Sequence, residues 1–148
     1  MIIIYTDGSC NNNGPNKGTG GWGAILRHLD LEKRICGYAS GTTSNRMELT
    51  APLMALSTLK RHDLQIELFS DSQYLIKGIT EWSTKWVRNG WRNTNGDEVT
   101  NKDLWVKLLK WDTRLKIRWK WIKGHSGHKY QEIAHHLADD GRTQLIKL

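Results

Sequence analysis

The chain has 148 residues, with 22 lysines and arginines against 15 acidic residues, and so a net charge of +7. This length is typical of one ordinary domain, and the basic surplus favours a polyanionic partner. Two cysteines cannot form a disulfide framework, and the apolar run at residues 2–4 is too short for a secretion signal or a membrane span. We therefore expect one soluble, monomeric, cytoplasmic domain over residues 1–148, without a membrane partner.

The first part of the chain predicts an antiparallel meander of three strands. A β-rich run over residues 2–6 ends at a turn-forming stretch, residues 7–9, and further strand candidates cover residues 22–29 and 34–40. Glycines at the start of the second strand permit another backbone to approach it closely.

Helical spacing of apolar residues then predicts a helix over residues 46–60, with Thr43 or Ser44 as its N-cap. Pro52 removes one hydrogen bond from the middle of this helix. A buried strand over residues 65–71 follows and ends on an acid.

The remaining chain predicts helices over residues 72–82, 103–113 and 130–146, a strand over residues 116–123, and an irregular, tryptophan-bearing excursion over residues 83–102. Strands early and late in the chain, with helices between them, indicate an α/β sheet with antiparallel and parallel parts. Nine basic residues and two acids lie from Lys102 to Lys129, so this stretch carries the positive surplus.

Three acids occupy positions that suggest a shared cleft. Asp7 closes the first strand, Asp71 closes the fourth, and Glu48 lies about one turn into the first long helix. Each acid alone has an ordinary explanation as a turn, helix-cap or capping-box residue. If the two strands pair in parallel, however, their C-terminal ends lie side by side. Three converging carboxylates repel one another unless a divalent cation such as Mg²⁺ neutralises them.

Several motifs occur in an order that resembles a known family. They are "YTDGSCNNNG", "GGWGAIL", "TTSNRMEL", "FSDSQYLIKGITEW", "KWVRNGW", "TNKDLW" and "WKWIKGHSGH". Together they closely resemble the type 1 ribonuclease H family over residues 2–138. The resemblance implies a ribonuclease H-like α/β fold: a five-stranded mixed sheet, with its first three strands antiparallel and the others parallel, flanked by helices on both faces.

The resemblance also implies an activity and a metal site. Members of the family hydrolyse the RNA strand of RNA–DNA hybrids with two Mg²⁺ ions, which Mn²⁺ can replace, and leave 3′-hydroxyl and 5′-phosphate ends. By motif, Asp7 matches the acid that bridges both ions, while Glu48 and Asp71 match acids that bind one. His125 matches a loop histidine that handles a proton or helps the product phosphate to leave.

Substrate-binding residues also follow by matching motif. Those that match contacts to the RNA strand are Asn13, Ser44, Asn45 and Gln73, with Ser44 standing where asparagine is more usual. Those that match contacts to the DNA strand are Thr43 and Asn101 of a phosphate-binding pocket, and Trp82 and Trp86, which pack on sugars. Hydrogen bonds to the 2′-hydroxyl would distinguish RNA from DNA.

Residues 81–101 resemble the basic protrusion, or handle, of bacterial members. From Glu81 to Asp103, however, four basic residues balance four acids, so the handle has no net charge. Trp91 is expected to brace it. We expect the other downstream tryptophans to belong to the core: Trp105, Trp111, Trp119 and Trp121.

The sequence departs from the family at the fourth acid, because alignment places His135 where the pattern has aspartate. Three explanations stay open: His135 contacts the metal directly or through water, Asp139 or Glu132 compensates, or the site is impaired. Three acids and one bridging phosphate supply about −4 against +4 from two Mg²⁺ ions. We therefore expect an active enzyme with weaker affinity for one ion.

Two other functions are compatible with the motifs. The chain could be a hybrid-binding module with impaired catalysis, owing to His135. It could also be another nuclease of the same superfold, such as a junction resolvase, since a fold alone does not determine the substrate. The three acids argue against the first alternative, and the residues matched to RNA and DNA contacts argue against the second.

Overall fold

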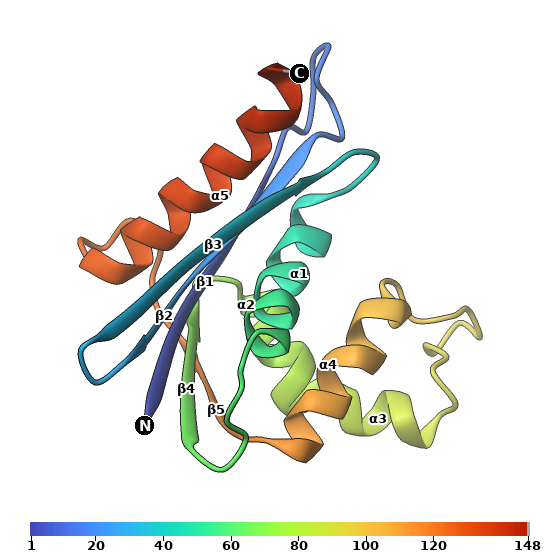
Figure 1. The fold of residues 1–148 in the computed structure, drawn as a ribbon. Helices are drawn as coiled ribbons and strands as arrows, with labels where there is room; N and C mark the ends of the chain where they lie inside the picture. The colour runs from blue at the N-terminus through green and yellow to red at the C-terminus, as the bar shows by residue number, and fades with distance from the viewer. Residues whose placement is uncertain (148) are drawn as a thin grey trace.

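The computed structural model describes residues 1–147 and contains a five-stranded sheet in the order β3-β2-β1-β4-β5 (Figure 1). The strands are β1 Ile2–Cys10, β2 Gly20–His28, β3 Leu31–Ala39, β4 Gln65–Ser70 and β5 Lys116–Trp121. The first three pair antiparallel, whereas β4 and β5 are added in parallel beside β1. The expected five-stranded mixed sheet is confirmed.

Helices cover both faces of this sheet (Figure 1). They are α1 Ser44–Ser57, α2 Gln73–Lys77, the π-helix η1 Gly78–Trp82, α3 Ser83–Arg88, α4 Lys102–Arg114 and α5 Lys129–Lys147. Successive side chains of β1 point to opposite faces of the sheet, so each face packs against its own helix. Ile4 lies in a hydrophobic cluster with Leu56 of α1, and Tyr5 lies in another with Ala134 of α5. Within residues 1–147, no helix has both the length and the apolar composition needed to cross a bilayer.

The strand β1 is longer than the sequence suggested. It continues through the expected turn because β2 supplies antiparallel partners as far as Cys10, opposite Gly20. Its parallel pairing with β4 ends earlier, at Thr6 opposite Ser70. Asp7 is therefore the first residue of β1 beyond the point where β4 ends.

The expected irregular excursion also begins later than predicted, because residues 73–88 form one uninterrupted helical run from α2 through η1 to α3. Leu75 and Ile79 of this run pack with the buried Trp105 of α4. Gly78 allows this contact, since a Cβ there would lie 2.6 Å from the Trp105 ring atom Cζ2. Tertiary packing thus keeps the chain helical where the local pattern predicted an interruption.

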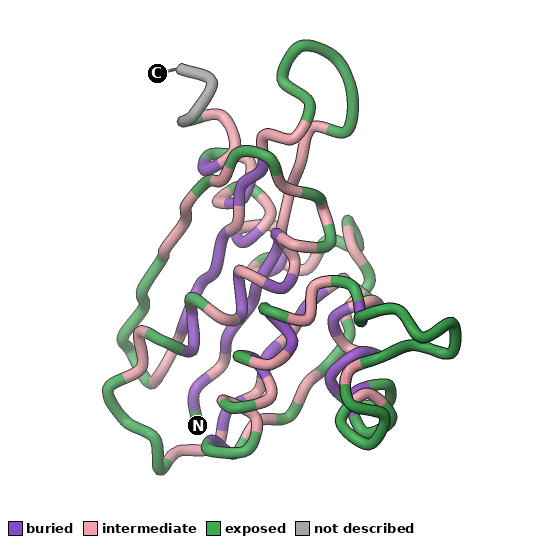
Figure 2. Tube along the Cα trace, turned by 90° about the vertical axis from the view of Figure 1, so that its right-hand side faces the viewer, coloured by how far each residue is buried: buried purple, intermediate pink, exposed green. Residues whose placement is uncertain are grey.

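Burial separates the sheet and its covering helices from the exposed tip of the handle, as Figure 2 shows. Trp105 is fully buried, and Trp111 and Trp119 pack against the core, as expected. The expectation for Trp121 is wrong, because its side chain is 47% exposed. Its position at the end of the edge strand β5 explains this exposure, and its Nε1 donates to the Asp71 carbonyl at 3.0 Å.

Candidate metal centre and nucleic-acid interface

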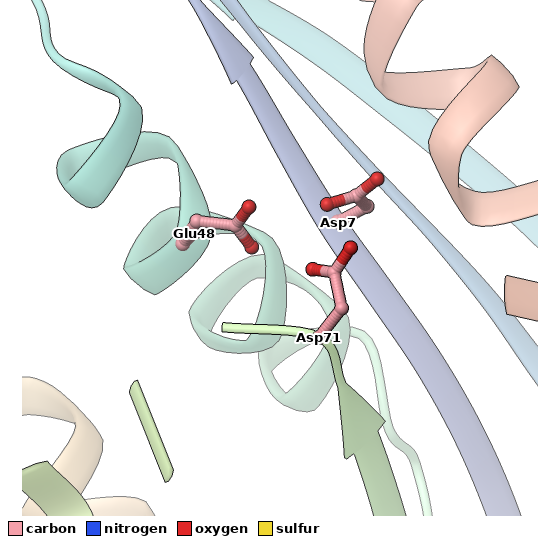
Figure 3. A group of neighbouring side chains, drawn as sticks. All are labelled: Asp7, Glu48 and Asp71. Carbon is pink, nitrogen blue, oxygen red and sulfur yellow. The ribbon is translucent and has the colours of Figure 1, made fainter. Parts of the chain in front are cut away.

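The three acids converge as predicted. Asp7 of β1, Glu48 of α1 and Asp71, which follows β4, have carboxylate oxygens within 4.8 Å of one another (Figure 3). The parallel register brings Asp7 and Asp71 together, because each directly follows a residue of the last β1–β4 pair. Gly8 lets α1 approach β1 and so brings Glu48 close to them, since a Cβ at position 8 would collide with the backbone nitrogen of Glu48.

The alternative structural roles of these acids are taken by other residues. Thr43 caps α1 by accepting a hydrogen bond from the Arg46 amide at 3.2 Å, which decides between the two predicted caps. Ser72 caps α2 by accepting from the Leu75 amide at 3.1 Å. Glu48 and Asp71 therefore do not cap these helices, and their carboxylates face the cluster.

The electrostatics of the cluster are unfavourable without a cation. Burial, followed by the charges of Asp7 and Asp71, raises the pKa of Glu48 well above its usual value. Burial and then the Asp7 charge raise the pKa of Asp71 to about 6. Among the described residues, the buried Oε2 atom of Glu48 has no hydrogen-bond partner. This unpaired oxygen and its two carboxylate neighbours fit a hard divalent cation.

His135, which the sequence matched to the family's fourth acid, lies beside the cluster. Its Nδ1 lies 3.0 Å from Asp7 Oδ2, and its Nε2 lies 3.4 Å from Asp139 Oδ2. Burial alone lowers the pKa of His135, but the hydrogen bond to Asp7 and the charge of Asp139 outweigh burial and raise it. Asp139 therefore contacts His135 and is not part of the three-carboxylate group.

His125 lies on the exposed loop between β5 and α5. Its ring centroid is 4.8 Å from that of His135, and its Nδ1 is 3.8 Å from Glu132 Oε1. Gly124 lets the loop pass close to the cluster, because a Cβ there would lie 2.7 Å from Asp71 Oδ2. The loop thus brings His125 beside His135, while Glu132 faces His125.

The residues matched to RNA contacts lie on the same chain segments as the acids. Asn13 is exposed on the loop that follows β1, and Gln73 is exposed at the start of α2, directly after Asp71. Ser44 and Asn45 form the first turn of α1, one turn before Glu48. A hydrogen bond of 3.4 Å from Ser44 Oγ to Asn12 Oδ1 joins two of these segments.

The two residues matched to a phosphate pocket, Thr43 and Asn101, contact two side chains that the sequence did not single out. Asn101 has a left-handed backbone, with φ at 63°, and its Oδ1 accepts from Arg46 Nη1 at 3.1 Å. Its Nδ2 donates to Tyr74 Oη at 3.2 Å. Arg46 is itself held by two hydrogen bonds to Asp103, of 2.8 and 3.0 Å. Arg46 also donates its amide to Thr43, so it links both pocket residues.

Trp82 and Trp86 begin a row of aromatic rings that ends in the core. Their ring centroids are 6.0 Å apart, and Trp86 lies 5.9 Å from Trp91 and 5.1 Å from Trp105. Trp91 therefore packs against the base of the handle, as expected. Trp82 is 39% exposed, so one end of this row is open to a ligand.

This sheet order, with carboxylates on β1, on α1 and directly after β4, is typical of an enzyme with a ribonuclease H-like fold. Residues 1–143 match the model of the RNase H family. The chain is 51% identical to "Ribonuclease H" of Hahella chejuensis over 98% of this chain and 95% of that protein. It is 47% identical to "Ribonuclease HI" of Caulobacter vibrioides over 97% and 93%, respectively.

A solved structure agrees with these relatives. The crystal structure of LC9-RNase H1, described as a type 1 RNase H with the type 2 active-site motif, superposes with a TM-score of 0.86 at 27% identity, over 97% of this chain and 72% of that one. The chain therefore belongs to the ribonuclease H family of endoribonucleases.

Proposed function

We propose that the chain hydrolyses the RNA strand of RNA–DNA hybrids by a mechanism with two divalent metal ions, leaving 3′-hydroxyl and 5′-phosphate ends. The observation that carries this proposal is the convergence of Asp7, Glu48 and Asp71, with a buried Glu48 oxygen that no described residue satisfies. Mg²⁺ is the proposed ion, because it prefers oxygen ligands, and Mn²⁺ would substitute for it. The chain would act as one monomeric catalytic domain in the cytoplasm.

Ions held by these acids would supply Lewis acidity that stabilises the charge developing on the phosphate. Asp7 would hold both ions, and Glu48 and Asp71 would each hold one of them. His125 would handle a proton of the reaction or help the product phosphate to leave. His135 would help to hold one of the ions.

Different residues would contact the RNA strand and the DNA strand of the hybrid. We assign the RNA strand to Asn13, Ser44, Asn45 and Gln73, whose side chains can donate to or accept from a 2′-hydroxyl. We assign the DNA strand to Thr43 and Asn101, which would bind a phosphate, and to Trp82 and Trp86, which would pack on sugars. Both pocket residues are linked through Arg46, which supports a single phosphate site.

A second candidate is a hybrid-binding module with impaired catalysis. The observation that favours it is His135, which pairs with Asp7 where the family has an acid. Charge counting favours catalysis, however, because three carboxylates and one bridging phosphate already balance two divalent ions, at about −4 against +4.

A labelled RNA–DNA hybrid tests the proposal, with single-stranded RNA and duplex DNA as control substrates, in Mg²⁺, Mn²⁺ or chelator. We expect cleavage of the RNA strand of the hybrid only, with 5′-phosphate products and no cleavage in chelator. Binding of the hybrid without cleavage in either metal would support the module instead. Cleavage of duplex DNA would indicate a different nuclease of this superfold.

A further inference from the structure

The helices leave one part of the sheet open. The helix α5 packs on β1, β2 and β3, and the neighbouring parallel strands β4 and β5 are largely uncovered on that side of the sheet (Figure 1). Ile117 and Trp119 of β5 pack against the core on the other side. Because side chains alternate along a strand, the cations Lys116, Arg118 and Lys120 point to the α5 side. All three are exposed, about 6.6 Å apart by strand geometry, and we call this α5 side of β4 and β5 the open face.

Aromatic rings lie between this row of cations and the first turn of α5. Phe69 of β4 stacks on Tyr5 of β1 with ring centroids 4.9 Å apart, and Tyr5 lies 5.4 Å from Tyr130 of α5. Phe69 and Tyr130 are only half-buried. Lys120 Nζ lies 5.8 Å from the Phe69 centroid, and Lys129 Nζ lies 5.5 Å from that of Tyr130. The open face thus combines cations with accessible aromatic side chains.

Acidic residues neutralise only part of the charge on this face. Glu67 of β4 pairs with Lys120, with Oε2 and Nζ 2.7 Å apart. Asp63, at the Lys116 end of the row, is paired with a neighbouring arginine at 2.7 Å. Among the side chains that the structure describes, neither Lys116 nor Arg118 forms an ion pair. The open face therefore has the sign of charge that complements a polyanion.

The open face adjoins the candidate metal centre. Lys120, the last cation of the row, lies in register with Phe69, which is two residues before Asp71. Lys123 is exposed and directly precedes Gly124, whose close approach to Asp71 brings the loop beside the acids. Positive charge thus continues from the acids to the row on β5. A nucleic-acid strand that leaves the metal centre over this loop reaches the open face next.

We propose that the open face binds a single-stranded segment that continues from the hybrid held in the metal centre. The inference rests on the proposed function, since the hybrid supplies that strand. The cations of β5 contact successive phosphates, and unpaired bases stack on the rings of Phe69 and Tyr130, as in proteins that bind single strands without sequence preference. A duplex fits this face less well, because its bases are paired inside the helix and do not reach the rings.

The alternative explanation of the row is protection of the edge strand, since charged residues on such strands prevent pairing with another sheet. Protection would give no preference for an unpaired strand. Fluorescence anisotropy in chelator compares two ligands: a blunt hybrid, and the same hybrid with a single-stranded extension of about ten nucleotides on one strand or the other. We expect an extension on at least one of the strands to tighten binding about tenfold.

Three variants assign this gain to the open face, and thermal melts establish that each is folded. Lys116→Gln with Arg118→Gln should reduce the gain to about twofold, and the loss of two phosphate contacts should make the log–log salt dependence of binding to the extended hybrid shallower by about 1.4. Lys33→Gln with Lys110→Gln removes the same charge from exposed positions on β3 and α4, and as the matched control should keep the full gain. Phe69→Leu keeps an apolar side chain without the ring, and should reduce the gain about fivefold.

Equal binding of blunt and extended hybrids by the unmutated protein would overturn the inference. An equal loss of the gain in the β5 double variant and in its control would overturn it too, because the effect would then depend on net charge alone. Cleavage separates these failures from failure of the proposed function. If the unmutated protein cuts the blunt hybrid in Mg²⁺ but gains nothing from an extension, only the role of the open face is wrong. If it cuts no hybrid in Mg²⁺ or Mn²⁺, the proposed function is wrong, while the comparison of the two ligands still decides on the open face.

Discussion

The carboxylate cluster and the row of tryptophans lie on the same molecule but are built on opposite principles. In the cluster, three like charges have oxygens within 4.8 Å of one another, and one buried oxygen of Glu48 lacks a partner among the described residues. In the row, Trp82, Trp86 and Trp105 have successive ring centroids 6.0 and 5.1 Å apart. Aromatic rings at such distances attract one another, whereas neighbouring carboxylates repel.

This difference indicates that the stability of the cluster, unlike that of the tryptophan row, depends on a bound ligand. The tryptophan row stabilises the folded protein in the absence of substrate, whereas repulsion among the carboxylates of the cluster destabilises it when no cation is present. Substitutions in the two regions should therefore have opposite effects on the stability of the metal-free protein. Four changes, from the largest expected effect to the smallest, test this contrast.

Glu48→Gln should give the largest loss of activity. Removing one ligand of the cation site should lower the rate of hybrid cleavage about 10³-fold, which corresponds to several kcal/mol of transition-state stabilisation. The metal-free melting temperature should rise, because the substitution removes a buried charge from the cluster. Single-turnover cleavage and thermal melts measure the two effects. Glu32→Gln, an exposed acid on β3, is the control and should change neither.

Trp105→Ala should give the largest loss of stability. The side chain is fully buried between α2, α3 and α4, and such truncations cost about 3–5 kcal/mol of unfolding free energy. Urea denaturation, with and without Mg²⁺, measures this loss. A loss below about 1 kcal/mol would mean that the row does not stabilise the fold.

The stability of the metal-free protein should fall as the pH rises from 5 to 8. Asp71 has a folded-state pKa of about 6 against an ordinary value of 3.8, so the folded state binds more protons in this range. The raised pKa of His135 acts in the same direction, because its contribution is present at low pH and is lost as the pH passes the folded pKa.

The Asp71 part of this pH dependence should amount to about 1 kcal/mol, after allowance for its partial exposure. Denaturation at pH 5, 6, 7 and 8 in chelator measures it, and Asp71→Asn should make the profile less steep by this amount. Stability that instead increases with pH across this range would contradict the charges assigned to the cluster.

Trp82→Ala should have the smallest effect. Because the side chain is 39% exposed at the open end of the row, we expect about fivefold weaker hybrid binding, close to 1 kcal/mol, with little change in stability. Binding to a hybrid in chelator, measured by fluorescence anisotropy, isolates this contribution from cleavage. Unchanged affinity would show that Trp82 does not contact the DNA strand.

The sequence predicted the sheet and the convergence of the acids because both depend on strong local signals. Asp7 and Asp71 each end an apolar run, and parallel pairing necessarily brings such positions together. The extension of β1 to Cys10 was missed, because it depends on partners in β2 that a turn-like local sequence cannot reveal. The helical run through α3 was missed because contacts with the distant Trp105 maintain it.

Asp139 illustrates a further limit of sequence reasoning. The sequence identified it only as an acid one turn after His135, and therefore as a candidate replacement for the missing ligand. Its hydrogen bond with Ser9, 130 residues earlier in the chain, turns it toward His135 instead. That orientation depends on how closely α5 packs against the glycines of β2, which the spacing of residues on one helix does not determine.

The most direct test of the account is the rate of RNA-strand cleavage in a hybrid, measured in Mg²⁺ for the unmutated protein and for Asp7→Asn, with melting curves of both. We expect the unmutated protein to cut only the RNA strand, and Asp7→Asn to be folded and to bind the hybrid without cutting it. Cleavage by folded Asp7→Asn at the unmutated rate would contradict the account, because the cluster centred on Asp7 would then not be the catalytic site.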